Sequence, residues 1–494
     1  MPLITRLLAS ARRNAGAPAV VEDDRTHTYG DLDRYSAELA GALAGLGTKT
    51  GDVVAIHAPR GWPRCAAVMA AWRLGAGVVS IAVDLPERRA RKVAASAGAR
   101  LVIRSEEAPP TGFPVPTHPI GSLRGGPVEE AVDGPIGYVI PTSGSTGEPK
   151  AVAVPPVVLE NLGIWHVEHW SHDVAPHTLH AASIGFDPVY EEMVATWLSG
   201  AALVVVDDET RRDYPLLMGT IREHGVSRCF LPLASLHGLA VAAAVEETGL
   251  PGLRELAVAG ERLVINDEVR EFCAADDIAV VNQYGPSETH VVTQYRLGKR
   301  PAEWPGHPPI GTAVVGAELL RCADGVLQPF AGGEEDELVI AGDCVGLGYL
   351  GDEDLTAQKF RTLPHVDGTA RRCYFSGDLV RFDGTHFHFL ARVDDQMKIR
   401  GYRVEPGEVE AVLAEVPGVR RAVAFGLERR GTLQLVACYA RGRGPAVPVE
   451  DLRAACHEVL PDYMVPVQYW EVEDFPVTPN GKVDRATLRD MFGG

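Results

Sequence analysis

The chain has 494 residues, too many for one ordinary hydrophobic core, so two or more domains are expected. A hydrophobic content of 46% and a charged content of 23% are typical of a globular protein. The formal net charge of -19 argues against a nucleic-acid or anionic-membrane surface, although it leaves room for a local basic site that binds an anionic cofactor.

The N-terminal sequence MPLITRLLASARRN predicts an amphipathic helix, because Leu3, Leu7 and Leu8 recur at helical spacing. It lacks the long apolar core of a secretory signal, and no run of about 18 apolar residues occurs anywhere in the chain. The eight cysteines are scattered without a C-x-x-C pair, which favours reduced thiols over a zinc site or a disulfide framework. We therefore expect a cytoplasmic protein.

Short apolar strands alternate with amphipathic helices through most of the chain before residue 391. Two clear strand-helix-strand examples are 52–59, 66–77 and 78–83, and then 201–208, 214–225 and 227–233. This rhythm predicts an α/β fold in which helices cover buried parallel sheets. Such sheets hold their ligands beyond the carboxyl ends of the strands.

A loop rich in hydroxyls and glycines, IPTSGSTGEPKAV, runs from Ile140 to Val152 after a predicted strand at 136–140. Glycines let the backbone curl so that its N–H groups face an anion, while the hydroxyls and Lys150 add donors and a positive charge. The loop suits a phosphate chain, although a solvated surface loop is the alternative. Because Lys150 follows Pro149 and precedes Ala151, the loop is not a Walker A motif.

The character of the sequence changes near Ala391, after a predicted strand in which Phe387 and Phe389 alternate with histidines. The helix expected next carries an apolar stripe at positions i, i+3, i+4 and i+7 and should end at Pro417. The stripe residues are Val409, Val412, Leu413 and Val416. Two further strands, RRAVAFGL and LQLVACYA, complete a small α+β unit. We predict two domains, at 1–391 and 392–494.

Four more motifs follow the hydroxyl-rich loop. They are NQYGPSETHV (282–291), YFSGDLVRF (374–382), ARVDDQMKIRGYRVEPGEVE (391–410) and PVTPNGKVDRATL (476–488). In this order the five motifs resemble the adenylate-forming superfamily, which includes acyl-CoA synthetases, firefly luciferase and adenylation domains of nonribosomal peptide synthetases. The resemblance covers nearly the whole chain from HTYGDL (27–32) onward. The wording of YGPSE and GYRVEPGEVE is most similar to that of the amino-acid-activating subclass.

This resemblance implies a large N-terminal α/β domain of stacked mixed or parallel sheets and a small mobile α+β lid. It also implies two half-reactions. A carboxylate attacks the α-phosphate of ATP, and a carrier-bound phosphopantetheine thiol then displaces AMP. Negative charge gathers on phosphate oxygens in the transition state, so cations and fixed donors are expected to do most of the catalysis.

The resemblance also assigns nucleotide contacts. Tyr284 is expected to stack on adenine, with Asn282 near the amino edge of the base. Ser287 would donate to the α-phosphate, and Glu288 would hold Mg²⁺, a cation that prefers oxygen ligands. For Glu288 the alternative is a helix-cap charge. The other expected ATP-binding positions are Thr142, Ser143, Gly144, Ser145, Thr146, Gly147, Lys150, Gly260, Glu261 and Gln283.

Asp378 is expected to accept both ribose hydroxyls, and Arg392 to make a second ribose or phosphate contact. A surface ion pair is the alternative for each. Lys482 in NGKVD is the expected catalytic lysine, because a mobile point charge on a long stem can bridge the substrate carboxylate and the α-phosphate. Asp394 matches the hinge about which the small domain turns, with a plain linker residue as the alternative.

The segment IGFDPVYEEM (184–193) resembles the start of the amino acid site, with Asp187 where the substrate ammonium binds. The other positions carried over are Pro188, Glu191, Ala234, Ala257, Ala259, Gln283, Val291 and Val292. Glu191 and Gln283 form an acceptor-rich side, which points to a polar or basic substrate, either an α or a β amino acid. A buried Glu needs a partner, so the alternative is that Glu191 pairs with a protein residue such as Arg or Lys.

Only 12 residues follow Lys482, so we expect a stand-alone ligase that loads a separate carrier protein, with a small activator protein as an open further partner. The first rival is an acyl- or aryl-CoA ligase that uses free coenzyme A, and Asp187 speaks against it. A catalytically silent relative is disfavoured by the presence of Lys482, Glu288 and Asp378. A P-loop kinase fails because no Gly-Lys-Ser/Thr sequence is present in the loop.

Overall fold

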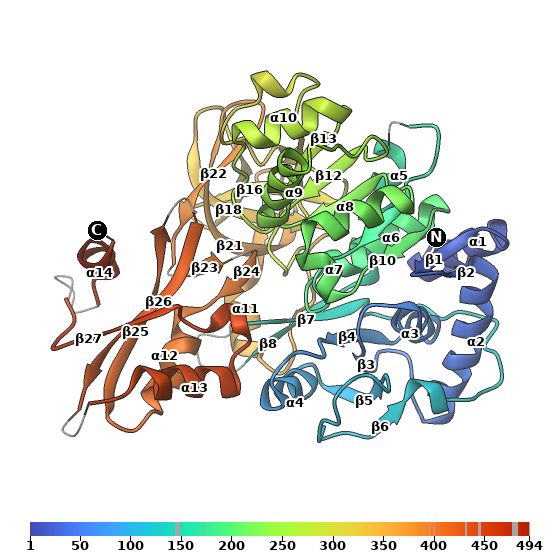
Figure 1. Cartoon of the computed structure of the whole chain (residues 1–494), viewed down its shortest axis with the longest axis horizontal. Helices are drawn as coiled ribbons and strands as arrows, with labels where there is room; N and C mark the ends of the chain where they lie inside the picture. The colour runs from blue at the N-terminus through green and yellow to red at the C-terminus, as the bar shows by residue number, and fades with distance from the viewer. Residues whose placement is uncertain are drawn as a thin grey trace. The chain divides into compact units, whose positions relative to one another are not determined.

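The computed structural model describes residues 1–143, 149–170, 172–394, 396–399, 401–429, 432–442, 446–476 and 483–493. The chain divides into two compact units (Figure 1). The larger comprises Met1–Val83, Ala94–Pro141 and Ala151–Val393, and the smaller comprises Asp84–Val93, Thr142–Lys150 and Asp394–Gly494.

The first sheet has nine strands. In sheet order they are β15 (Thr312–Ala313), β14 (Thr293–Arg296), β13 (Ala279–Tyr284), β12 (Glu255–Val258), β11 (Arg228–Leu231), β9 (Thr178–His180), β10 (Leu203–Val205), β1 (Pro18–Glu22) and β2 (Arg25–Thr28). The strands from β13 to β1 are parallel, whereas β2, β14 and β15 run antiparallel to their neighbours.

The second sheet has seven strands, of which β3 to β7 pair in parallel. In sheet order they are β19 (Gly348–Tyr349), β8 (Lys150–Val154), β7 (Tyr138–Thr142), β4 (Gly77–Ile81), β3 (Val53–His57), β5 (Ala99–Arg104) and β6 (Thr117–Pro119). The third sheet is antiparallel. Its strands are β17 (Val326–Pro329), β16 (Ala317–Ala323), β18 (Glu335–Gly342), β21 (Ala370–Phe382), β20 (Phe360–Pro364) and β22 (Phe387–Arg392).

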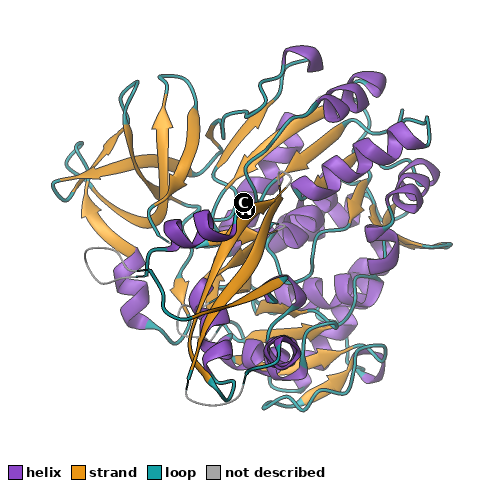
Figure 2. Ribbon diagram, turned by 60° about the vertical axis from the view of Figure 1, so that its left-hand side comes forward, coloured by secondary structure: helices purple, strands orange, loops and turns teal. Residues whose placement is uncertain are grey.

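Helices cover the strands of these sheets, as Figure 2 shows. They are α1 (Leu3–Arg13), α2 (Tyr29–Gly45), α3 (Trp62–Arg73), α4 (Glu87–Ser96), α5 (Pro156–His169), α6 (Pro188–Ser199), α7 (Asp208–Arg212), α8 (Tyr214–Glu223), α9 (Leu233–Val245), α10 (Asp267–Asp276) and α11 (Glu353–Lys359), with 3₁₀ turns at Ile120–Ser122 and Pro301–Glu303. The strand-helix rhythm read from the sequence is thus present, and α1 buries the predicted Leu3, Leu7 and Leu8.

The main core lies between the first two sheets. In β10, Leu203 and Val205 belong to this core, while Val204 packs into a second cluster with α8, α9 and α10. Alternate residues of a strand face opposite sides of a sheet, so the nine-stranded sheet is covered on both faces. Helix α6 is buried on every side from Val189 to Trp197, as expected for a helix between two layers.

The smaller unit is an α+β assembly with its own core. Its elements are β23 (Met397–Ile399), β24 (Tyr402–Val404), α12 (Pro406–Ala414), β25 (Val419–Arg429), β26 (Thr432–Arg441), α13 (Val449–Val459), a 3₁₀ turn at Asp462–Met464, β27 (Gln468–Val472) and α14 (Arg485–Phe492). The apolar stripe of α12 is buried as predicted, but the helix ends at Ala414, three residues before Pro417. Val416 therefore packs into the core from beyond the helix end. The expected combination of a large α/β domain and a small α+β domain is confirmed.

All eight cysteines are free, and seven of them are buried. Burial raises the pKa of the Cys65, Cys273 and Cys438 thiols to about 12 and that of Cys456 to about 11. Among the helices of the described residues, none has the length and hydropathy that a bilayer span requires.

Candidate active site

Three residues predicted to hold the nucleotide meet at the carboxylate of Asp378. The register of β21 against β22 places Asp378 opposite Arg392, and Arg392 Nη1 donates to Asp378 Oδ1 at 2.6 Å. The hydroxyl of Tyr284 donates to Asp378 Oδ2. Burial and the nearby Asp378 charge raise the pKa of Tyr284 well above its ordinary value, so this hydroxyl stays protonated. Each carboxylate oxygen has a further lone pair, which suits a pair of ribose hydroxyls.

The end of β13 contributes to two different places, because successive strand residues face opposite sides of a sheet. Asn282 donates its amide N–H to the carbonyl of Pro309 at 2.8 Å, which leaves its own amide oxygen as an acceptor. Gln283 instead donates from Nε2 to Glu191 Oε1 at 3.2 Å. Its side chain therefore belongs with the predicted amino acid residues, although the sequence placed Gln283 in both sets.

Glu288 is completely buried, and its Oε1 accepts a hydrogen bond of 2.7 Å from the hydroxyl of Tyr349 in β19. Ser287, just before it, is partly buried. No cluster of three or more His, Cys, Asp or Glu side chains able to hold a metal occurs in the part of the chain that the structure describes. A single carboxylate fits Mg²⁺, which proteins usually bind through one or two carboxylates together with substrate phosphates.

The hydroxyl-rich loop begins where β7 ends and finishes where β8 begins. Thr142 and Ser143 are buried, and Lys150 is the first residue of β8. Gly144, Ser145, Thr146 and Gly147 lie outside the described residues, as does the predicted catalytic Lys482.

Two other predicted positions, Gly260 and Asp394, lie outside the named helices and strands. Gly260 follows β12 with φ at 93°, a conformation that favours glycine, and the partly buried Glu261 comes next. Asp394 opens the last stretch of the smaller unit, and its Oδ1 accepts the N–H of Gln396 at 3.3 Å.

Asp187 directly precedes α6, with Pro188 as the first residue of the helix. Its side chain is partly buried and makes no capping hydrogen bond to the helix. Among the described residues, no cationic side chain forms an ion pair with it. Desolvation, reinforced by the neighbouring Glu191 charge, raises the pKa of Asp187 despite the opposing effect of His290. The negative charge of the Asp187 carboxylate is therefore poorly compensated by the described part of the protein, and a bound cation would stabilise it.

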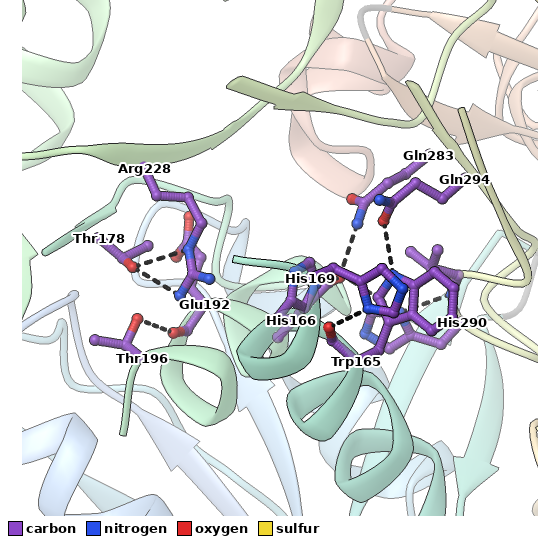
Figure 3. A network of polar contacts seen from close by, with 12 residues as sticks. Trp165, His166, His169, Thr178, Glu192, Thr196, Arg228, Gln283, His290 and Gln294 are labelled. Carbon is purple, nitrogen blue, oxygen red and sulfur yellow. Dashed lines mark hydrogen bonds and ion pairs between the residues drawn. The ribbon is translucent and has the colours of Figure 1, made fainter. Parts of the chain in front are cut away.

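Glu191, one helical turn further along α6, has a different environment. It is 2% exposed, and its Oε1 accepts hydrogen bonds from His166 Nε2 at 2.7 Å and from Gln283 Nε2 at 3.2 Å. Burial alone would raise the pKa of Glu191, but the hydrogen bonds from His166 and Gln283 act against it, and the pKa is lowered. Figure 3 shows His166, Gln283 and His290 close together in this network. The partner is a histidine, rather than the arginine or lysine that the sequence suggested.

The remaining predicted substrate residues divide by burial. Ala257 packs with Ala195, Phe230 and Val281 in a small apolar cluster. Val291 and Val292 are buried, and Ala259 is partly buried. Ala234 is exposed on α9, so the structure does not place it among these buried residues.

Two histidines near Glu191 were missed by the sequence analysis. His166 continues the buried row of Val158 and Leu162 along α5, and a histidine on an apolar helix face was the available signal. His290 lies two residues after Glu288 and has a left-handed backbone with φ at 57°. Its Nδ1 accepts the N–H of Val291 at 2.8 Å, and its buried Nε2 has no hydrogen-bond partner among the described residues. Such backbone outliers are common at functional sites.

Comparison with known proteins agrees with this geometry. The family model described as AMP-binding enzyme matches residues 7–350, and that of the AMP-binding enzyme C-terminal domain matches residues 408–482. Surfactin synthase subunit 1 of Bacillus subtilis is 32% identical to this chain. The match covers 97% of this chain but only 13% of the length of the synthase subunit. Novobiocin biosynthesis protein H of Streptomyces niveus is 33% identical over 97% of this chain and 81% of its own length.

Among solved structures, an artificially fused adenylation–PCP di-domain, NpsA-ThdA from Klebsiella oxytoca, superposes with a TM-score of 0.84. It shares 25% sequence identity, and the match covers 95% of this chain and 93% of that chain. The two family models, the relatives and the fold agree. The chain therefore belongs to the AMP-binding family of adenylate-forming, ATP-using ligases, in the branch that contains the adenylation domains of nonribosomal peptide synthetases.

Proposed function

We propose that the chain activates an amino acid as aminoacyl-AMP and transfers it to the phosphopantetheine thiol of a separate carrier protein. The observation that supports an amino acid most directly is Asp187, a partly buried carboxylate without a cationic partner in the described part of the chain. A substrate ammonium would supply the missing positive charge. Asp187 belongs to the same compact unit as Tyr284, Asp378 and Arg392.

In the first step a substrate carboxylate oxygen bonds to the α-phosphorus of ATP, and the bond to the β-phosphate oxygen breaks to release pyrophosphate. In the second step the thiol sulfur bonds to the activated carbonyl carbon, AMP departs, and the thiol proton is lost to solvent. Charge builds up on phosphate oxygens in the first step, so donors and cations there lower the barrier.

The residue roles are part of this proposal. Tyr284, Asn282, Asp378 and Arg392 hold the nucleoside, and Ser287 donates to the α-phosphate. When bound through Glu288 and the phosphates, Mg²⁺ would offset phosphate charge. The hydroxyl-rich loop, including Thr142, Ser143 and Lys150, surrounds the β- and γ-phosphates.

The moving parts are likewise a proposal. Lys482 supplies the mobile positive charge at the reacting carboxylate, and Asp394 is the hinge of a lid formed by residues 392–494. The transfer step is supported by the likeness to an adenylation–PCP di-domain. An acyl- or aryl-CoA ligase using free coenzyme A is the alternative, and it gives the Asp187 carboxylate no partner.

An ATP–pyrophosphate exchange screen tests the first step. We expect exchange that depends on an amino acid, and little with fatty or aryl acids that lack an ammonium. Lys482→Ala should lower the exchange rate by roughly 100- to 1000-fold, the usual loss when one donor to a developing oxyanion is removed. ATP binding should survive in this variant. Unchanged turnover, or exchange with aryl acids alone, would contradict the proposal.

A further inference from the structure

The two acidic residues at the start of α6 differ in their partners. Asp187 has no cationic partner among the described residues, whereas Glu191 already accepts hydrogen bonds from His166 and Gln283. His166 belongs to α5 and Gln283 to β13, so the two donors come from separate parts of the sequence; Figure 3 labels both side chains. A buried carboxylate needs such partners, and here the protein itself provides them.

The second carboxylate oxygen of Glu191, Oε2, remains available as a hydrogen-bond acceptor. Both donors reach Oε1, while Oε2 lies 4.0 Å from His290 Nδ1, too far for a hydrogen bond. His290 Nδ1 also already accepts the N–H of Val291, so it has no proton to offer Glu191. Oε2 is therefore an oriented acceptor on a carboxylate that two protein donors already stabilise.

We propose, on the basis of the amino acid activation proposed above, that Glu191 Oε2 accepts a hydrogen bond from an uncharged polar substrate side chain. The substrate class is an amino acid whose side chain carries a hydroxyl or amide donor. Of the two acids, only Asp187 lacks a protein partner for its negative charge among the described residues, and the substrate ammonium supplies that partner. His166 is a positioning residue that fixes Glu191 for this task and offsets its charge. The sequence left open whether the substrate side chain is polar or basic, and the partners of Glu191 favour a neutral polar one.

His166→Phe tests the role of the histidine in the exchange assay. Phenylalanine keeps a planar ring beside Phe230, which His166 now meets edge-on with ring centroids 5.2 Å apart, but it removes the donor. The parent should use serine-, threonine- or glutamine-like substrates in preference to lysine or ornithine. In His166→Phe the ratio of kcat/KM for basic over neutral substrates should rise about tenfold or more, because the Glu191 charge is then exposed to the substrate.

Two further variants separate positioning from general damage. His166→Gln retains a side-chain N–H donor and should keep the parent's order of substrates. His169→Phe is the matched control, because His169 lies on the same helix, is exposed and stacks on Trp165 at 3.6 Å between ring centroids. Its substrate order should equal that of the parent.

If His166→Phe does not fold, Glu191→Gln tests the acceptor directly. Its amide oxygen takes the place of Oε1 beside His166 and Gln283, so an NH2 donor replaces the acceptor Oε2. Relative to alanine, the hydroxyl and amide substrates should lose about five- to tenfold in kcat/KM in this variant. A parent that prefers basic amino acids, or a His166→Phe enzyme with an unchanged order, overturns the inference while leaving amino acid activation intact. Absence of exchange with every amino acid would instead refute the proposed function itself.

Discussion

Individual carboxylates in this molecule acquire different properties from their neighbours. Asp378 is held by Arg392 and Tyr284, and Glu288 by Tyr349. Asp187 lacks such a donor among the described residues, and its pKa is raised, whereas the pKa of Glu191 is lowered by its hydrogen bonds. These environments support the proposal that the two acids, one helical turn apart, bind different groups, an ammonium at Asp187 and a neutral hydrogen-bond donor at Glu191.

Asp187→Asn is expected to weaken amino acid activation and to stabilise the fold. Removal of the acidic partner of an ammonium costs about 2–5 kcal/mol, which corresponds to roughly 30- to several-thousand-fold in kcat/KM. The pKa of Asp187 is raised in the folded state, so ionisation of this carboxyl destabilises the fold. The loss of stability is absent below the ordinary carboxyl pKa and grows as the pH rises to the raised pKa.

The variant should therefore melt at a higher temperature than the parent near pH 7, and the difference should shrink as pH falls toward 4. Thermal unfolding across this pH range measures the effect. Asp173→Asn, at an exposed position, serves as the control and should change neither property. A variant that melts lower than the parent at neutral pH would show that Asp187 is paired within the protein.

At the scale of elements, α6 brings the core and the candidate site together. Asp187 directly precedes the helix, Glu191 lies in its first turn, and its last turn contains Trp197. The Trp197 side chain is fully buried and donates its indole N–H to the carbonyl of Ala19 at 3.3 Å. Between them, Glu192 accepts the N–H of Ala182 at 2.9 Å and contacts His180 Nδ1 at 2.7 Å, which ties the helix to the end of β9. The packing of this helix therefore sets the geometry of the residues proposed to bind the substrate.

Trp197→Ala is expected to lower the free energy of unfolding by about 3–5 kcal/mol, the usual loss for a buried aromatic side chain. It should also raise the KM for the amino acid more than that for ATP, because the cavity loosens α6 and leaves β21 and β22 untouched. Denaturant unfolding and exchange kinetics measure the two effects. Leu216→Ala, at an exposed site on α8, should change stability by less than about 0.5 kcal/mol. Equal losses in both variants would contradict this account.

At the scale of the whole molecule, the proposed reaction needs both units. Proline at residue 394 fixes φ near −65° and removes a backbone N–H, which restricts rotation there. We expect Asp394→Pro to change the ratio of pyrophosphate exchange to carrier loading by at least tenfold, because one arrangement of the lid is favoured over the other. Asp394→Ala, which leaves the backbone free, should keep the ratio near that of the parent. A proportional loss of both rates in the proline variant would speak against a hinge at this residue.

Features that depend on local sequence could be predicted, whereas contacts that arise only from tertiary packing could not. Strand-helix periodicity and motif order were sufficient for the α/β architecture and for selecting Tyr284, Asp378 and Arg392, which the structure brings together. The partner of Glu191 depends on how α5 packs against α6, so the sequence suggested Arg or Lys where the structure has His166. Local pattern cannot rank donors that become neighbours only through tertiary packing.

The burial of the cysteines has a practical consequence for the proposed reaction, whose product, an aminoacyl-AMP, is a reactive mixed anhydride. A thiolate is the species that would capture the activated acyl group, and seven of the eight thiols are buried, with pKa values of about 11 or above for Cys65, Cys273, Cys438 and Cys456. Self-acylation at the seven buried thiols is therefore suppressed at neutral pH, which leaves the partly exposed Cys322 as the remaining thiol of the chain. In a Cys322→Ser variant, maleimide or iodoacetamide reagents should thus label the prosthetic arm of the proposed carrier in preference to the ligase, so that acyl occupancy of the carrier can be followed in a mixture of the two.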